Sequence, residues 1–271
     1  MALPLIKRSI VKNILTVCWL GIAVSLCAFT PLGKRPQYRV RTIVIDAGHG
    51  GKDPGTHGKY VKEKTVALNV AMELGKQIKK NFPGVKIYYT RTTDKFVELQ
   101  ERAAIANRNR ADLFISVHCN ANPASSIHGT ETYTMGLHTS EGNLEVAKRE
   151  NSVILLEDNH EKKYSGYDPD SPMANILFAN YQSAFIENSL RFARHVESQF
   201  DRRAGRKSRG VKQAGFIVLW KTAMPSALVE IGYLSNPKEE KFLKTAEGQE
   251  NIAEAIYRGF KEYKEDMETP D

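Results

Sequence analysis

Residues 41–51 read RTIVIDAGHGG, and this stretch decides the fold that we expect. Its first half is a β-branched run typical of a buried strand, and its second half contains three glycines that permit a sharp turn. The next apolar residues recur at intervals of four, the spacing of an amphipathic helix over residues 62–80: Val66, Val70, Leu74 and Ile78. A strand, a turn and a helix in this order are typical of an α/β domain.

The same alternation of strand and helix patterns continues toward the C-terminus. We expect further strands at residues 85–90, 112–118, 129–135, 216–220 and 226–231, and further helices at residues 97–109, 174–200 and 252–263. Alternation of this kind predicts a single α/β domain over residues 38–268, with a mostly parallel twisted sheet flanked by helices.

Residues 138–182 interrupt this alternation. They contain a polar stretch, an amphipathic helix at about residues 144–157 and the turn-rich loop YSGYDPDSP. A connection of this length is uncommon in a compact domain, so we interpret it as an insertion that forms a helical lid.

The first thirty residues form a segment unlike the rest of the chain. Lys7, Arg8 and Lys12 precede a long uncharged apolar stretch, and small residues near its end suit a cleavage site, as in an export signal. The stretch is also long enough to span a bilayer, so an uncleaved N-terminal anchor is the alternative to a cleaved signal peptide at residues 1–30. A lipid on Cys27 is disfavoured because bulky Leu26 precedes it. We expect an exported, periplasmic protein that meets the membrane only if this segment is uncleaved.

Composition limits the class of protein further. With 41% hydrophobic and 26% charged residues among 271, the chain is neither disordered nor collagenous and can bury a sizeable core. Its three cysteines cannot form a disulfide framework for this length. The 39 Lys and Arg against 31 Asp and Glu give a net charge of +8, which favours an anionic partner. An exported chain without a recognisable nucleic-acid-binding motif is not expected to bind nucleic acid, which leaves an acidic polymer or a membrane surface.

Four residues with catalytic or metal-binding side chains fall at one edge of the expected sheet. Ligands gather at the carboxyl ends of the strands in open α/β sheets. The residues at or near these ends, or at the start of the first helix, are His49, His118, Glu230 and Glu63. Two imidazoles and one carboxylate are the ligand set of a catalytic zinc with an open fourth position, and a second carboxylate would act as general base.

Each of these residues alone has an ordinary structural interpretation. A histidine at a strand end is usually a satisfied structural residue, Glu63 suits the dipole of a first helical turn, and Glu230 could be a buried acid paired with an arginine. The glycines around His49 do not match a phosphate-binding loop, and a sharp turn that exposes His49 explains them better. The coincidence of all four at one edge favours the metal site.

The chain also resembles a known family at these positions. The matching segments are DAGHGG at residues 46–51, Glu63, SVHCN at residues 116–120, and MPSALVEIGYLSN at residues 224–236. Together they resemble the zinc-dependent N-acetylmuramoyl-L-alanine amidases of cell-wall turnover, over about residues 42–263. The resemblance implies that His49, Glu63 and His118 hold Zn²⁺ and that Glu230 is the catalytic carboxylate. Cys119 departs from the family, which usually has a small residue there, and we expect it to be buried.

The resemblance also implies a substrate and a reaction. The substrate is peptidoglycan, and the bond that is hydrolysed is the amide between the lactyl group of N-acetylmuramic acid and L-alanine of the stem peptide. Such an enzyme serves wall remodelling or daughter-cell separation. The alternatives are a zinc peptidase that cuts within the stem peptide, and a non-catalytic wall-binding module of the same fold.

The insertion resembles a regulatory element of the cell-division branch of this family. There an inserted helix covers the zinc site and supplies a carboxylate to it, and an activator protein displaces the helix. The resemblance makes Glu150 the candidate inhibitory carboxylate, with Glu145 and Glu157 as alternates. A solvated surface helix with ordinary acidic residues is the alternative.

The remaining charged and titratable residues have simpler expectations. We expect His57, His128, His138, His160 and His195 on the surface or in loops. The basic run from Arg202 to Arg209 is expected to be a solvated face or loop, and its functional alternative is attraction to anionic glycan or to stem-peptide carboxylates.

Overall fold

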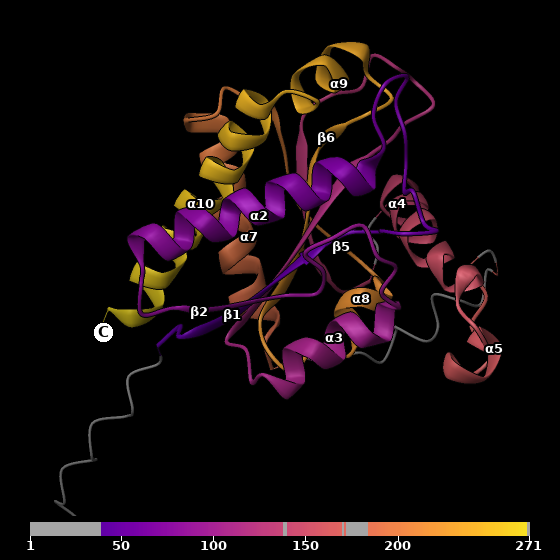
Figure 1. Ribbon diagram of the computed structural model, residues 1–271, viewed down its shortest axis with the longest axis horizontal. Coiled ribbons are helices and arrows are strands. Elements are labelled where there is room, and N and C mark those ends of the chain that lie inside the picture. The colour runs from indigo at the N-terminus through magenta and orange to yellow at the C-terminus, as the bar shows by residue number, and fades with distance from the viewer. Residues whose placement is uncertain (1–38, 138–139, 170, 172–183, 270–271) are drawn as a thin grey trace, which may run out of the picture. The chain divides into compact units, whose positions relative to one another are not determined.

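The computed structural model describes residues 39–137, 140–169, 171 and 184–269 (Figure 1). The predicted signal peptide or anchor at residues 1–30 and His138 lie outside these ranges, as does the start of the helix expected at residues 174–200. Among the described helices, none combines the length and the apolar character that a membrane span requires.

The described strands form one mixed, mostly parallel sheet. Its six strands lie in the order β2-β1-β3-β6-β4-β5. Their bounds are β1 (Thr42–Ala47), β2 (Lys86–Tyr89), β3 (Leu113–Asn120), β4 (Thr130–Met135), β5 (Ser208–Ala214) and β6 (Ser226–Tyr233). The pairing of β4 with β6 is antiparallel, and the other pairings are parallel. The carboxyl ends of β1, β3 and β6 therefore meet at one edge of the sheet, and the predicted α/β class is confirmed.

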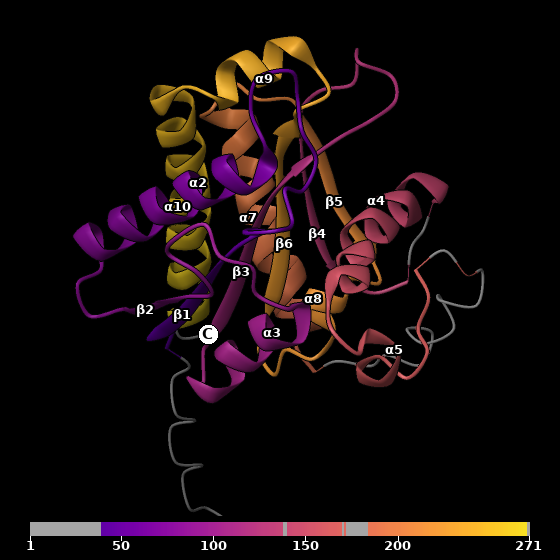
Figure 2. The ribbon, with the colours of Figure 1, turned by 45° about the vertical axis from the view of Figure 1, so that its right-hand side comes forward.

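Helices cover both faces of this sheet (Figures 1 and 2). One face carries α2 (Glu63–Asn81), α7 (Ile186–Arg202) and α10 (Ala246–Glu268). The other carries α3 (Leu99–Arg108), α4 (Glu141–Asn151), the 3₁₀ helix η1 (Ser152–Leu156) and α8 (Ile217–Trp220). Two short helices complete the described part, α5 (His160–Lys163) and α9 (Pro237–Leu243).

The alternation of side chains along β3 decides which face receives the site. Every residue of β3 is buried, as expected for a central strand covered on both faces. Leu113, Ile115 and Val117 pack in the core under α2, α7 and α10, whereas Phe114 packs in the core under α3, α4 and α8. His118 is in phase with Phe114, so its side chain lies on the face that α4 covers.

The insertion packs against the sheet. Its helix begins after Ser140, whose Oγ accepts a hydrogen bond from the backbone N–H of Asn143, and α4 then continues into η1. Four apolar side chains of this segment are buried in the core of that face, Val146, Ala147, Val153 and Ile154, whereas Leu155 and Leu156 are exposed. The lid is therefore a packed layer of the fold and not a solvated surface helix.

Two expectations about secondary structure were wrong. Residues 216–220, expected as a strand, form the short helix α8, since a brief apolar run has no periodicity that separates a strand from a buried helix. Strand β5 was missed because its sequence, SRGVKQA, has no alternation of apolar and polar residues. It lies at the edge of the sheet, where polar and charged residues are common.

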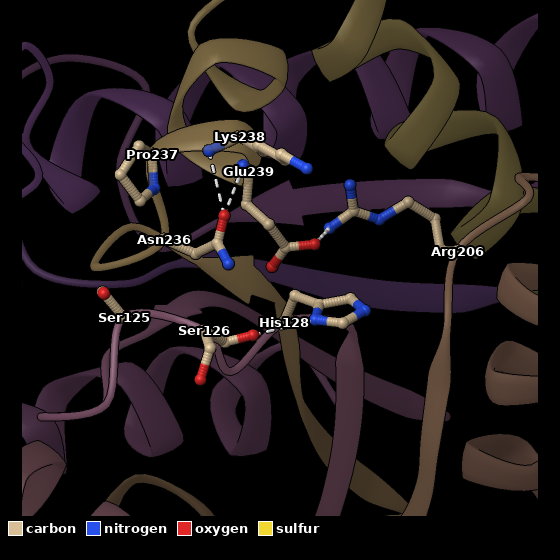
Figure 3. Close-up of a pocket in the computed structure, with 8 residues that line it drawn as sticks. All are labelled: Ser125, Ser126, His128, Arg206, Asn236, Pro237, Lys238 and Glu239. Carbon is tan, nitrogen blue, oxygen red and sulfur yellow. Dashed lines mark hydrogen bonds and ion pairs between the residues drawn. The ribbon is translucent and has the colours of Figure 1, made fainter.

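The arginines of the basic run at residues 202–209 lie in three different environments. Arg202 and Arg203 are exposed at the end of α7, as expected. Arg206 is largely buried and pairs with Glu239 of α9 (Figure 3). Arg209 belongs to β5 and is half-buried. Arg206 and His128 line an open cavity of about 600 Å³ beyond the ends of β3 and β6, together with Ser125, Ser126 and residues 236–239.

Candidate active site

The turn after β1 places His49. Its backbone has φ 60°, in the left-handed region, and Gly50 and Gly51 follow with φ 125° and 57°. A Cβ atom at Gly48 would lie 2.5 Å from the ring of His118, so only glycine lets the two histidines approach. The glycine run thus builds the sharp turn that the sequence predicted.

Two buried arginines stabilise this turn through hydrogen bonds to its backbone carbonyl oxygens. Arg102 forms an ion pair with Asp46 (Nη1–Oδ1 2.8 Å) and donates from Nη2 to the carbonyl oxygen of His49 (2.8 Å). Arg91 donates to the carbonyl oxygens of Ala47 and Gly48. These contacts satisfy backbone carbonyls that the turn removes from the sheet, so the arginines have a structural role.

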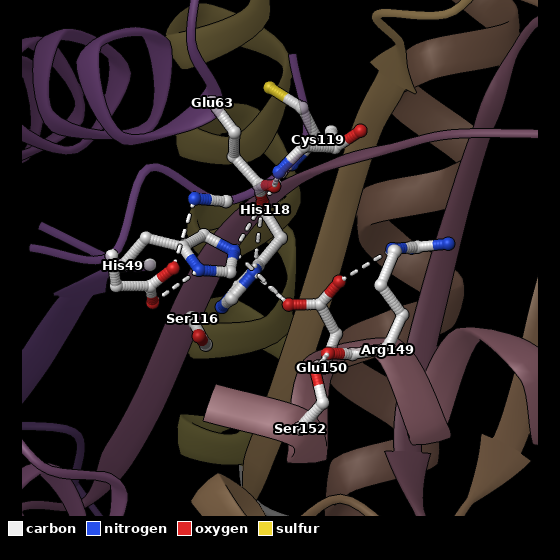
Figure 4. Close-up of polar contacts among 12 residues, drawn as sticks. His49, Glu63, Ser116, His118, Cys119, Arg149, Glu150 and Ser152 are labelled. Atoms are coloured by element: carbon white, nitrogen blue, oxygen red, sulfur yellow. Dashed lines mark hydrogen bonds and ion pairs between the residues drawn. The ribbon is translucent and has the colours of Figure 1, made fainter. Parts of the chain in front are cut away.

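Four side chains converge at the carboxyl edge of the sheet (Figure 4). One ligand atom from each of His49, Glu63, His118 and Glu150 lies within 4.8 Å of the other three, and all four residues are buried. Oε1 of Glu63 is 3.0 Å from Nε2 of His49 and 3.0 Å from Nδ1 of His118. Oε2 of Glu150 is 3.1 Å and 3.0 Å from the same two nitrogens. Segments more than one hundred residues apart thus meet at one point.

Hydrogen bonds to residues outside the cluster fix the orientation of His49 and Glu63. Nδ1 of His49 lies 2.7 Å from Oδ2 of Asp53, which leaves Nε2 facing the cluster. Glu63 accepts hydrogen bonds from the backbone N–H groups of Cys119 (2.8 Å) and Thr56 (2.8 Å). A carboxylate on the far nitrogen of a histidine is typical of metal sites. Asp53 was missed in the sequence, where its only signal is its place four residues after His49.

The cluster fits a metal ion. Nε2 of His49 and Oε2 of Glu150 are buried and make no hydrogen bond of acceptable geometry with any described residue, although they are 3.1 Å apart. Burial lowers the pKa of His118, but the carboxylates of Glu150 and Glu63 outweigh it and raise this pKa to about 9. The pKa of His49 is likewise raised by Glu63, Asp53 and Glu150 against the effect of burial. The surroundings thus favour positive charge at this point, which a divalent cation supplies.

Glu230 lies beside the cluster on the neighbouring strand. It is opposite His118 in the β3–β6 ladder and is fully buried. Neither carboxylate oxygen has a hydrogen-bond partner among the described residues, and Nη2 of Arg149 is 3.5 Å from Oε1. Burial and the charge of Glu150 raise the pKa of Glu230 well above its ordinary value. A buried carboxylate with raised proton affinity, held off the metal ligands, suits a general base.

Helix α4 occupies the mouth of this site. Arg149 donates to Oε1 of Glu150 (3.1 Å), to the carbonyl oxygen of Ala121 (3.3 Å) and to Oδ1 of Asn120 (3.1 Å). The cavity that remains among His49, His118, Glu150 and their neighbours has a volume of about 10 Å³, which is about the room needed for one water molecule. A substrate therefore cannot reach the two histidines while α4 is in this position.

Comparison with known proteins identifies the family. A family model described as N-acetylmuramoyl-L-alanine amidase matches residues 43–262, which include the whole cluster. The chain belongs to this amidase family. The amidase AmiC of Escherichia coli O6:H1 is 36% identical over 234 residues, which cover 85% of this chain and 54% of AmiC. This chain thus matches about half the length of that relative.

Solved amidase structures share the fold. The catalytic domain of CwlV from Bacillus (Paenibacillus) polymyxa var. colistinus has a TM-score of 0.60 and 31% identity, covering 82% of this chain and 97% of that domain. The CwlD amidase from Clostridioides difficile, solved in complex with the GerS lipoprotein, has a TM-score of 0.60 and 26% identity, covering 82% and 98%.

The structure separates the three candidate inhibitory acids. Glu150 reaches the cluster, as described above. Glu145 is exposed and pairs with Lys148. Glu157 accepts hydrogen bonds from the backbone N–H of Leu99 (2.8 Å) and the hydroxyl of Tyr164 (2.8 Å), at the start of α3 and outside the cluster. Of the three, Glu150 alone approaches the histidines.

The other titratable residues of the amidase mostly lie where they were expected. Cys119 is buried under α2, and burial raises the pKa of its thiol well above the ordinary value. Among the described histidines outside the cluster, none is fully buried: His57, His128, His160 and His195. A further acid, Glu131, lies on β4 directly opposite Glu230 and was not singled out in the sequence.

Proposed function

We propose that this chain is a Zn²⁺-dependent amidase of peptidoglycan that hydrolyses the amide between N-acetylmuramic acid and L-alanine of the stem peptide. The observation that carries the proposal is the buried convergence of His49, Glu63 and His118, with Glu230, whose carboxylate accepts no hydrogen bond from the described residues, one strand away. Membership of the amidase family supports the choice of this amide over one within the stem peptide.

In this proposal the protein side chains have separate roles. His49, Glu63 and His118 hold the zinc ion, and Asp53 keeps the ring of His49 in the orientation that presents Nε2. Zinc, when bound, supplies Lewis-acid activation of a water molecule and of the scissile carbonyl. Glu230 accepts the proton of the attacking water and passes it to the leaving amine nitrogen of L-alanine. Its buried position raises its proton affinity, which favours the first of these two transfers.

We further propose that the conformation described here is self-inhibited. Oε2 of Glu150 contacts both imidazoles, where the water and the scissile carbonyl have to lie. Arg149, its neighbour on α4, lies against Glu230 and ties the helix to the loop after β3. An activator protein that displaces α4 would open the site. The complex of CwlD with GerS is a precedent for a protein partner within the family.

We also propose that the chain acts outside the cytoplasm, in wall remodelling or cell separation. The basic, then apolar, first thirty residues support export, and peptidoglycan as the substrate requires it.

The role of Glu230 is tested by Glu230→Gln. We expect this variant to keep one zinc ion per chain but to release dye from labelled peptidoglycan at least about 100-fold more slowly, because the general base is lost. Zinc content and dye release are measured together, in the wild-type and in the Glu150→Gln background, with the exposed Glu161→Gln as the matched control. Release at a near-wild-type rate by Glu230→Gln would remove Glu230 from the mechanism.

A further inference from the structure

Glu131 collects five side-chain donors at the position next to Glu230. The two acids are directly opposite in the antiparallel β4–β6 ladder, so both side chains lie on the face that α4 covers. Glu131 is 2% exposed. Its donors are Nε of Arg209 (2.8 Å), Nζ of Lys212 (2.6 Å), the hydroxyls of Tyr133 (2.7 Å) and Tyr233 (2.7 Å), and Nδ2 of Asn120 (3.1 Å). The row of functional side chains therefore continues past Glu230 to the edge strand.

Arg209 and Lys212 carry two positive charges, one more than is needed to neutralise Glu131. Two hydroxyls and an amide already donate to the carboxylate, and one cation would neutralise it, so the second leaves a net positive charge. The side chains of Arg209 and Lys212 are 28% and 24% exposed, on the outermost strand. Each uses only part of its donor capacity on Glu131. Positive charge is thus presented to solvent on the same face as the metal ligands.

Aromatic contacts hold these cations in place. The guanidinium carbon of Arg209 lies 5.8 Å from the ring centre of Tyr233, and Nζ of Lys212 lies 5.8 Å from that of Tyr133. Together with Glu131, the tyrosines restrict two side chains that would otherwise be flexible. A site organised in this way before binding loses little side-chain entropy when an anion arrives.

The setting of Arg206 is different. It pairs with Glu239, whose Oε2 in turn accepts from the backbone N–H of Tyr233 (2.6 Å), and one cation is matched there by one carboxylate (Figure 3). Arg209 and Lys212, in contrast, share a single acid.

The distance from the metal ligands to these cations suits a stem peptide. Strands lie about 4.8 Å apart, so β5 is about 10 Å from Glu230 on β6 and about 14 Å from His118 on β3. An extended peptide covers this span in roughly three or four residues. The lactyl carboxyl of muramic acid is consumed in the scissile amide, so the free carboxylates of the substrate are on the peptide side.

We propose that Arg209 and Lys212, positioned by Glu131, form a subsite for a stem-peptide carboxylate three or four residues from the scissile amide. This inference rests on the proposed amidase function and assigns the direction in which the peptide lies, from the metal ligands across β6 and β4 toward β5. Helix α4 lies beside the same strands (Figure 2), and its Arg149 donates to Asn120, which also donates to Glu131. Displacement of α4 would therefore open the path along the sheet from the metal site to the subsite.

The subsite is tested with two matched substrates, a muramoyl tetrapeptide with free carboxylates and its carboxamide counterpart, in the Glu150→Gln background. We expect kcat/KM about 5- to 30-fold higher for the acid, as charge-assisted contacts to a carboxylate would give. The double variant Arg209→Gln, Lys212→Gln should lose this preference through KM, with kcat within about twofold. Arg209→Lys should keep most of it, and Lys207→Gln, an exposed cation of the same run, should keep it all.

The outcomes separate the subsite from the proposed function. Cleavage of both substrates with the same acid preference in the double variant overturns the subsite and leaves the amidase function standing. An equal fall in kcat for both substrates, with a lowered melting temperature, assigns the cations a purely structural role and also overturns it. If neither substrate is cleaved, the proposed function fails, and calorimetric binding of the free tetrapeptide still decides the subsite: equal affinity for wild type and double variant contradicts it.

Discussion

Among the described residues, Asp53 alone makes a hydrogen bond that orients the ring of His49. We therefore expect metal affinity to be more sensitive to Asp53 than to any other residue that does not itself bind the metal. Without the contact of Oδ2 with Nδ1, the imidazole can rotate and the wrong nitrogen can carry the proton. The ring also contacts that of His118 edge-on, with 4.9 Å between the ring centres.

We therefore expect Asp53→Asn to weaken zinc binding by about 10- to 100-fold, the usual effect of losing such a partner. Affinity is measured by competition with a chelating dye, and Asp158→Asn, an exposed acid of the insertion, is the control. Unchanged affinity in Asp53→Asn would contradict a role for the charge of this carboxylate in metal binding.

The four residues first singled out in the sequence could be predicted because strand ends and a helix start converge at one edge of an α/β sheet. Asp53, Arg149 and Glu131 could not, because their roles depend on contacts across a turn, from the insertion and across a strand pairing. Glu150 was found only through the resemblance to the family, since nothing in the residues around it distinguishes it from Glu145.

At the level of elements, α4 is both a lid and a part of the core. Its Val146 and Ala147, with Val153 and Ile154 of η1, are buried against the sheet, and burying a valine or isoleucine side chain contributes roughly 1.5–3 kcal/mol. Deleting the insertion would remove these contacts together with Glu150, so a point substitution separates the two effects better.

Glu150→Gln is that substitution. It removes the charge that faces both imidazoles and should raise basal hydrolysis of labelled peptidoglycan by about 10- to 100-fold, the range of a charge-assisted contact. Glu145→Gln, on the same helix but exposed, should leave the rate unchanged. Equal rates for wild type and Glu150→Gln would contradict the self-inhibited state.

Glu157 gives the insertion a second, structural link to the domain. The helix α3 has no side-chain cap of its own, and Glu157 accepts from the N–H of its first residue, Leu99. We expect Glu157→Ala to lower the free energy of unfolding by about 1–2 kcal/mol, measured by urea denaturation. The neighbouring Glu161→Ala should have no effect. A stability equal to wild type in Glu157→Ala would mean that water caps α3 as well as this carboxylate does.

Helices and strands whose apolar residues follow a clear pattern could be predicted from the sequence, and those without such a pattern could not. The helix over residues 63–81 and the strand at residues 113–120 were found because their apolar residues repeat or run together. The edge strand β5 and the short helix α8 carry no such signal, since the first is polar and the second is too brief.

At the level of the whole molecule, the sheet order creates the site. Strand β6 pairs with β3 across more than one hundred residues of sequence and aligns Glu230 with His118. The pairing of β4 with β6 then aligns Glu131 with Glu230. Neither the order nor the register can be read from spacing along the chain, yet together they make one row of charged side chains that extends from the metal ligands to the edge of the sheet.

The most direct test of this account is mass spectrometry of peptidoglycan fragments after digestion by the purified Glu150→Gln variant. We expect free stem peptides that begin with L-alanine and glycan with unsubstituted muramic acid, lost on addition of a chelator and restored by zinc. Fragments cut within the stem peptide, or the same products at full yield in the presence of chelator, would contradict a zinc amidase.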